Sequence, residues 1–365
     1  MLRPFSFVIV SADMSQVDQG RFAIQYSPNV PGILNALGAH LALSTYQAGK
    51  VVFIGSRDGH RIEQVPVSFP RPMGIAFHEK RLAVATKEDI RFFSASDKYK
   101  ARFSEHPERI DRIYFPRARM YTGALDLHDV EFGEGGLWAV NTRFSCICTF
   151  GPDHSFSPRW KPQWISDITP EDRCHLNGMI MRDGKPIYAT ALSMTDTKAG
   201  WREDITHTGV FMEVPSGRVV ADGLAMPHSP RSIDGFVYML LSAKGELVKL
   251  DPDTGNVQVL AQLNGFCRGM AHVGNMLFIG MSKLRKTSKT FSKLPVAEMD
   301  DRAGIILFDL LQNEVIGHLW YDTTVEEIYD VRVYPSTAAP GLIDAEDPRH
   351  NHLIMTRFRD FYRTD

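Results

Sequence analysis

Three histidines recur at corresponding places in the sequence and carry its strongest chemical signal. They are His128 in Leu-His-Asp-Val, His175 in Cys-His-Leu-Asn-Gly and His228 in Pro-His-Ser-Pro-Arg. The carboxylate of Glu327 lies at the same stage of a later repeat. Neutral imidazoles with one carboxylate suit a divalent transition metal such as Fe, Cu, Mn or Zn, whereas calcium prefers oxygen ligands. We therefore expect a mononuclear site with these four residues as ligands and with open positions for water or substrate.

Further polar residues fall at the starts of the first strands or at the ends of the second strands, and they suggest how such a site would act. Arg268 would stabilise developing negative charge, and Tyr329 or Glu326 would serve as acid or base. The predicted substrate-binding residues are Tyr46, Gln47, Arg143, Asn177, Arg231 and Lys283. The leading hypothesis is a metal-dependent enzyme acting on a polar or anionic small molecule or peptide. Lyase, hydrolase and oxygen-dependent chemistry all stay open.

The competing interpretation is structural. A single histidine at the start of a strand is more often a hydrogen-bonded structural residue than a ligand, and only the recurrence argues for a metal. His272 aligns with an apolar position and is predicted to be structural. The alternative function is a non-catalytic ligand-binding or scaffold propeller. A scaffold would be expected to present a broad apolar patch rather than a histidine cluster, which favours the enzyme.

The elements that must position these residues form an internal repeat. Each copy has a strand that begins with small or polar residues, then a turn, then a second apolar strand. The copies recur every 40 to 60 residues or so, roughly the size of one four-stranded propeller blade. The first strands are expected at residues 73–77, 128–132, 177–181, 229–233, 268–272 and 329–333. The pattern predicts an all-β fold, a single β-propeller of six four-stranded blades over residues 1–365.

The last copy lacks its outer strands, and the N-terminal region holds spare ones. Residues 40–46, 51–55 and 63–67 match the second, third and fourth strands of a blade. We expect these strands, within about residues 39–69, to complete the last blade and close the ring. Seven blades remain possible if this region forms its own blade with residues 352–356.

Three stretches interrupt the regular spacing. They are expected to be insertions at about residues 104–122, 155–173 and 285–302. Loops of this length in a compact domain are more often functional lids than accidents.

Composition excludes several classes of partner. The formal net charge is -2 with no long basic or acidic block, which argues against nucleic acid or a membrane surface. No glycine-rich phosphate loop opens a helix, so no nucleotide cofactor is expected. The apolar run at residues 5–10 is too short for a signal-peptide core, and the four cysteines suit free buried thiols. These features predict a cytoplasmic protein.

Several motifs together resemble one family. They include Leu-Ser-Thr-Tyr-Gln-Ala-Gly at residues 43–49, Phe-Cys-Arg-Gly at 266–269 and Glu-Glu-Ile-Tyr-Asp at 326–330, besides the three histidine motifs. The sequence resembles a bacterial β-propeller family of uncharacterised function, sometimes joined or adjacent to tetratricopeptide-repeat proteins. The resemblance covers about residues 35–335 and implies the propeller without an activity. The fold is also similar to metal-dependent propeller lactonases and lyases, among which the histidine-rich lyases and oxygenases fit better than calcium lactonases.

Overall fold

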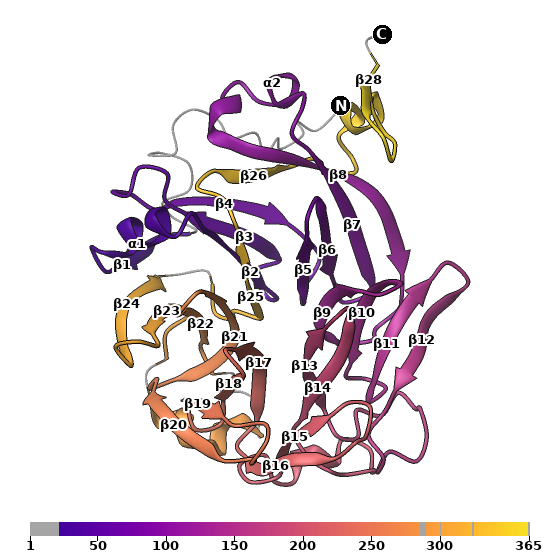
Figure 1. Cartoon of the computed structure of the whole chain (residues 1–365), viewed down its shortest axis with the longest axis vertical. Coiled ribbons are helices and arrows are strands. Elements are labelled where there is room, and N and C mark those ends of the chain that lie inside the picture. Colours follow the sequence, from indigo (N-terminus) through magenta and orange to yellow (C-terminus); the bar gives the residue numbers. More distant parts are fainter. Residues whose placement is uncertain (1–21, 285–289, 300, 323–324, 364–365) are drawn as a thin grey trace.

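The chain folds into six antiparallel blades whose innermost strands surround a common axis (Figure 1). The computed structural model describes residues 22–284, 290–299, 301–322 and 325–363. Blade 1 contains β5 (Ile75–His78), β6 (Arg81–Ala85), β7 (Asp89–Ser96) and β8 (Ile110–Tyr121). Blade 2 contains β9 (Leu127–Gly133), β10 (Gly136–Asn141), β11 (Cys146–Gly151) and β12 (His154–Trp160). Blade 3 contains β13 (Leu176–Arg182), β14 (Lys185–Ala191), β15 (Gly209–Glu213) and β16 (Val219–Leu224).

The remaining blades follow the same plan. Blade 4 contains β17 (Pro227–Ile233), β18 (Phe236–Leu241), β19 (Glu246–Leu250) and β20 (Val257–Gln262). Blade 5 contains β21 (Phe266–Val273), β22 (Met276–Ser282), β23 (Gly304–Asp309) and β24 (Glu314–Tyr321). Blade 6 contains β25 (Asp330–Tyr334), β2 (His40–Thr45), β3 (Lys50–Gly55) and β4 (Glu63–Ser68).

Blade 6 confirms the predicted closure of the ring. Its inner strand β25 comes from the C-terminal part of the chain and pairs antiparallel with β2, with Ser44 opposite Asp330. The strand predicted at residues 352–356 lies elsewhere: β27 (Leu353–Met355) pairs only with β28 (Asp360–Tyr362). The seven-blade alternative is therefore wrong, because the N-terminal strands already form the outer part of blade 6.

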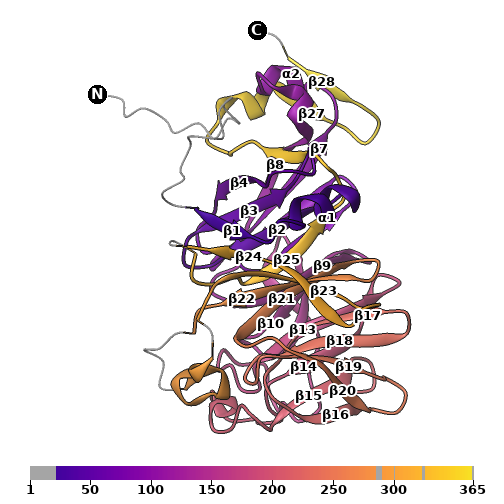
Figure 2. The same ribbon diagram turned by 90° about the vertical axis from the view of Figure 1, so that its left-hand side faces the viewer.

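Short elements lie around the blades. β1 (Ile24–Tyr26) adds a fifth strand to blade 5, and β26 (Ala339–Leu342) pairs parallel with β8. The helices are α1 (Val30–Ala36), α2 (Lys100–Phe103), η1 (Pro107–Arg109), η2 (Gly200–Arg202), η3 (Phe291–Lys293), η4 (Pro295–Glu298) and η5 (Pro348–His352). The hairpin of β27 and β28 lies beside α2 at one end of the molecule (Figure 2). No helix in the described residues is long and apolar enough to cross a membrane.

The predicted insertions need two corrections. Most of residues 104–122 is the outer strand β8, whose alternation is obscured by the half-buried Arg112 and the exposed Arg117 and Arg119. Residues 155–173 begin within the outer strand β12, and only the part after Trp160 is a loop. The third stretch holds η3 and η4, and residues 285–289 and 300 lie outside the described residues.

The core is divided among the blade interfaces. One apolar cluster joins β3 of blade 6 to β6 of blade 1 through Phe53 and Leu82, and another joins β10 of blade 2 to β13 of blade 3 through Val140 and Leu176. Similar clusters fill the other four interfaces. Because both faces of each sheet are covered, the sequences of the blade strands are apolar runs and do not alternate between apolar and polar residues. This packing holds the inner strands at a fixed spacing around the axis.

Candidate functional site

A β-bulge recurs on the inner strands of four successive blades, close to where each strand begins. In blade 2, Leu127 lies opposite Asn141 and Val130 opposite Ala139, so three steps on the inner strand match two on its partner. The same shift occurs between Leu176 and Met179, His228 and Arg231, and Cys267 and Met270. Bulges re-aim side chains and are over-represented next to active sites. The repeated bulge therefore brings polar residues to the same end of the channel.

His128 and His228 are held by the same arrangement in blades 2 and 4. The Nδ1 of His128 lies 3.0 Å from the carbonyl oxygen of Asp126, and that of His228 lies 2.9 Å from the carbonyl oxygen of Met226. Each Nδ1 is also 2.9 Å from a hydroxyl, that of Thr142 or Ser242. A carbonyl can only accept, so the proton belongs on Nδ1 and the neutral ring keeps a lone pair on Nε2.

The two hydroxyls link each histidine to the next blade. The Thr142 hydroxyl donates to the Leu176 carbonyl at 2.6 Å, and the Ser242 hydroxyl donates to the Cys267 carbonyl at 2.6 Å. Because each hydroxyl donates its proton to that carbonyl, its oxygen accepts a hydrogen bond from the imidazole Nδ1–H. The orientation of the ring is therefore tied to the position of the neighbouring blade.

His175 is held by a carboxylate instead. Its Nδ1 lies 3.0 Å from both oxygens of Asp172, and the indole Nε1 of Trp201 donates to the same carboxylate at 2.9 Å. The rings of His175 and Trp201 are 4.2 Å apart between centroids. His175 adopts a left-handed backbone conformation with φ of 50°, which is unusual for a non-glycine residue. Within the described part of the chain, no hydrogen bond uses the Nε2 of His128, His175 or His228.

Arg268 and Tyr329 complete this end of the channel. The guanidinium carbon of Arg268 lies 3.5 Å from the centre of the Tyr329 ring, and its Nη1 lies 3.5 Å from Glu327 Oε1. Tyr46 stacks on Tyr329, with 5.9 Å between the centroids of the two rings. Glu327 is 9% exposed, so its carboxylate is removed from water and neutralises part of the Arg268 charge.

A small cavity of about 10 Å³ lies among these side chains, room for about one water molecule. Its lining includes His128, His228, Asn177, Arg268 and Tyr329. Burial, reinforced by Arg268, holds the pKa of both cavity histidines well below the ordinary value, so the two imidazoles are neutral at pH 7. Burial likewise raises the pKa of Tyr329, which keeps its hydroxyl protonated.

The predicted metal ligands come close without forming a finished metal site. The rings of His128 and His175 are 4.8 Å apart between centroids, in an edge-to-face arrangement. Among the residues that the structure describes, no three His, Cys, Asp or Glu side chains are arranged to hold a metal ion. Glu327 faces Arg268 and is not part of the cavity lining.

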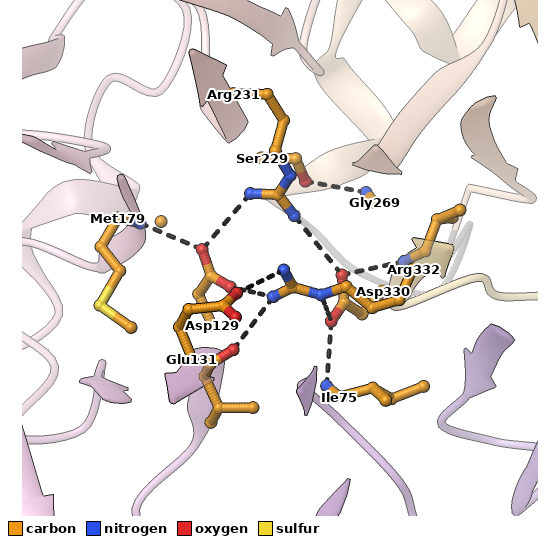
Figure 3. Close-up of polar contacts among 12 residues, drawn as sticks. Ile75, Asp129, Glu131, Met179, Ser229, Arg231, Gly269, Asp330 and Arg332 are labelled. Atoms are coloured by element: carbon orange, nitrogen blue, oxygen red, sulfur yellow. Dashed lines mark hydrogen bonds and ion pairs between the residues drawn. The ribbon is translucent and has the colours of Figure 1, made fainter. Parts of the chain in front are cut away.

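Arg231, predicted to bind substrate, belongs to a buried charge network across the channel (Figure 3). Its Nε donates to the Met270 carbonyl at 2.8 Å, and its guanidinium lies between Asp129 and Asp330 at 3.7 and 3.8 Å. Arg332 pairs with the same two carboxylates and with Glu131. Arg231 therefore belongs to the network and also to the lining of the cavity.

The other predicted residues lie around the channel end. Arg143 pairs with Asp126 at 2.8 Å and lines a separate surface cleft of about 460 Å³ with Phe144 and Phe156. The backbone N–H of Lys283 donates to the Glu326 carbonyl at 2.8 Å, so the ends of blades 5 and 6 meet there. The side chains of Glu326 and Gln47 are exposed.

Sequence reasoning missed the residues that hold the site. The missed residues are Asp172, Trp201, Thr142, Ser242, Asp129, Glu131, Asp330 and Arg332. One signal was available: Asp-Val follows the first polar residue in both blade 2 and blade 6, as Asp129-Val130 and Asp330-Val331. Each of these aspartates accepts a backbone N–H of the next blade, from Met179 and Ile75.

These features define a six-bladed β-propeller with a buried, histidine-containing polar site at one end of its channel. Residues 28–343 match the family described as Domain of unknown function (DUF4915), and since this match spans most of the chain, the protein belongs to that family. The match confirms the resemblance to an uncharacterised propeller family. No curated protein matches the sequence.

Two solved structures are similar in fold. One is a chain in the crystal structure of a nidogen/laminin complex, with 13% identity, a TM-score of 0.54, and coverage of 83% of this chain and 100% of that chain. The other is a protein of unknown function from Bacteroides caccae, with 10% identity, a TM-score of 0.49, and coverage of 81% and 98%. At such low identity, the first similarity shows the propeller fold alone.

Proposed function

We propose that this protein is a metal-dependent enzyme that binds one divalent transition metal ion where the inner strands begin. The observation that supports this most is the fixed protonation of His128, His175 and His228. Each imidazole holds its Nδ1 proton on a carbonyl or carboxylate and leaves Nε2 with a lone pair. Histidines that bind metals almost always have this second contact, which fixes the tautomer and the ring orientation.

The surrounding residues suit a polar or anionic small molecule or peptide as substrate. A bound metal would supply a Lewis acid or an activated water molecule. Arg268 would stabilise negative charge on the substrate, and the protonated Tyr329 hydroxyl would donate a hydrogen bond to it. Glu327 would join the ligands only by exchanging its Arg268 contact for the metal. Metal binding would also require the three imidazoles to turn toward a common point, since they are not yet arranged as a set.

The first experiment is metal analysis of the purified protein, with and without reconstitution. We expect about one equivalent of a transition metal, and an affinity at least about tenfold lower in His128→Ala, His175→Ala and His228→Ala. His272→Ala is the matched control. His272 lies on β21, the strand that also carries Arg268, and its Nδ1 contacts the Gly274 carbonyl just after that strand. Less than about a tenth of an equivalent after reconstitution would exclude the metal-dependent function.

The second candidate is a non-catalytic propeller that binds a small ligand in the channel. The incomplete convergence of the three histidines favours it. A protein that binds ligand but no metal, and whose affinity does not change in the three histidine variants, would support this candidate instead.

We also propose a reducing compartment, the cytoplasm, as the site of action. All four cysteines are free and buried, and burial raises the pKa of the Cys146, Cys174 and Cys267 thiols to about 12. Unpaired thiols of this kind are typical of proteins that are not exposed to oxidising conditions.

A further inference from the structure

Three buried hydrogen-bond donors in the channel cavity have no acceptor among the described residues. They are Nδ2 of Asn177, Nη2 of Arg268 and the hydroxyl of Tyr329. All three side chains line the cavity, and they come from blades 3, 5 and 6. Asn177 and Tyr329 are 4% and 6% exposed, and the Arg268 side chain is 12% exposed. Unsatisfied buried donors are costly and rare, so three around one cavity indicate a missing acceptor.

The neighbouring carboxylates are committed elsewhere. Asp129 pairs with Arg332 and accepts the Met179 N–H, and Asp330 pairs with Arg332 and accepts the Ile75 N–H. Both carboxylates also line the cavity, but these contacts already occupy their oxygens. The described residues therefore supply no acceptor to the three donors, and either water or a bound ligand takes that place.

The three donors are also held in place. Stacking on Tyr329 and the ion pair with Glu327 fix the plane of the Arg268 guanidinium. Its Nη2 has no hydrogen-bond acceptor among the described residues. Asn177 lies within the bulge of β13, followed by Gly178, whose N–H donates to the Thr190 hydroxyl oxygen at 3.0 Å. A donor set fixed before the ligand arrives loses little conformational entropy when it binds.

We propose that Asn177, Arg268 and Tyr329 form a pocket for a carboxylate group, which would make the substrate a carboxylic acid. This inference rests on the proposed function and narrows its substrate class. One guanidinium with two neutral donors matches the single charge and two oxygens of a carboxylate. The cavity holds only about one water molecule, so it has to widen for any anion, and it has to widen less for a carboxylate than for a phosphate with four oxygens.

Acetate is the simplest probe, with acetamide as a neutral molecule of the same shape. Titration calorimetry in chloride-free buffer should detect acetate binding and no acetamide binding. Tyr329→Phe and Asn177→Leu should each weaken acetate binding roughly tenfold or more, because each removes one hydrogen bond to a charged group. Tyr321→Phe is the matched control, since its hydroxyl is also buried and without a partner in the described residues but lies outside the channel. It should leave acetate binding unchanged.

Thermal unfolding of each variant is the control for correct folding. Tyr329→Phe removes an unpartnered hydroxyl, so its Tm without ligand should equal or exceed that of the wild type, while the rise in Tm caused by acetate is lost. Absence of acetate binding up to about 100 mM, or binding that both variants retain, would overturn the pocket. Binding of inorganic phosphate in place of acetate would overturn the carboxylate assignment.

Metal content measured on the same preparations separates the two proposals. Bound metal without acetate binding would overturn the carboxylate pocket and leave the metal site standing. Acetate binding that depends on Tyr329 and Asn177, in protein that takes up no metal, would support the pocket and exclude the metal-dependent function.

Discussion

At the scale of single residues, the site depends on how each imidazole is oriented rather than on the histidines alone. His128 and His228 use a backbone carbonyl and a hydroxyl, whereas His175 uses the carboxylate of Asp172. A charged acceptor raises the basicity of an imidazole more than a neutral carbonyl does. Of the three proposed ligands, His175 is therefore the one at which a change of hydrogen-bond partner should alter metal affinity most.

Asp172→Asn tests this role. The asparagine has one side-chain acceptor for two donors, the Nδ1–H of His175 and the indole N–H of Trp201. We expect metal affinity to fall roughly 10- to 100-fold, as measured by competition with a chromogenic chelator. Asp196→Asn is the control, because Asp196 pairs with Arg173 near the same loop and does not contact the histidine. Equal metal affinities in the two variants would rule out a positioning role for Asp172.

The charge network gives a second residue-scale prediction through Glu131. Burial raises the pKa of Glu131 above its ordinary value of 4.5, although Arg332 opposes the shift. The folded protein therefore binds this proton more tightly than the unfolded chain does. The resulting stabilisation is present below about pH 4.5 and is lost as pH rises through the folded-state pKa.

Glu131→Gln should remove this dependence on pH. Relative to the wild type, the variant should gain unfolding free energy as pH rises from 4.5 to 7, as measured by denaturant unfolding at several pH values. Glu314→Gln changes an exposed residue on β24, and its unfolding free energy should vary with pH as that of the wild type does. A variant that loses stability relative to the wild type over the same range would show that the pairing with Arg332 outweighs burial.

At the scale of elements, the sequence predicted the strands and the ring closure but not the bulges. Apolar runs such as those of β10, β18 and β22 mark buried strands without ambiguity. A bulge adds one residue, which breaks the alternation that would otherwise tell inward from outward side chains. Gly178, Pro230 and Gly269 within the inner strands were the available signals, because such residues in strand interiors often mark bulges.

This loss of alternation also explains why only some residues of the site could be predicted from the sequence. His128, Asn177 and Arg268 were correctly placed at the channel end because each begins an inner strand. Arg231 lies just past its bulge, in the same cavity lining, and its part in the charge network was not predicted. Asp172 and Trp201 lie in loops with no repeat counterpart, so no periodicity could relate them to His175.

Gly178→Ala tests the close packing that the bulge requires. A Cβ at this position would lie 2.4 Å from Cδ of Pro230 on the next inner strand. The clash should lower the unfolding free energy by about 1–3 kcal/mol, as measured by chemical denaturation. Gly151→Ala is the matched control within a strand, because nothing lies within 4 Å of its Cβ. Equal stabilities would mean that blades 3 and 4 can separate at the bulge without cost.

At the scale of the whole molecule, the channel network ties blades that are not neighbours. Arg332 on blade 6 pairs with Asp129 and Glu131 on blade 2, past the intervening blade 1. Arg231 on blade 4 reaches Asp129 on blade 2 and Asp330 on blade 6. Three alternate blades are thus held together, independently of the six apolar interfaces between adjacent blades.

Arg332→Ala tests this connection across the ring. Although burial alone would lower it, the three carboxylates raise the pKa of Arg332 above its ordinary value, so the guanidinium is charged at every accessible pH. Its removal leaves Asp129, Glu131 and Asp330 buried with Arg231 as the remaining cation of the network. Breaking a buried ion pair on one side costs about 3–5 kcal/mol, and we expect a loss of that size in unfolding free energy.

A further question is whether the ring of blades unfolds as one cooperative unit. Arg218→Ala, which breaks the exposed pair with Glu213 on blade 3, should have a much smaller effect. If the network closes the ring as a unit, Arg332→Ala should lower the single transition of the whole propeller, seen alike by calorimetry and by tryptophan fluorescence. A transition that splits, with blade 6 separating first, would show that closure depends on β2 and β25 pairing alone. Because His128 directly precedes Asp129 on β9 and Tyr329 directly precedes Asp330 at the start of β25, the variant should also weaken ligand binding at the channel end, which links the stability of the ring to the geometry of the site.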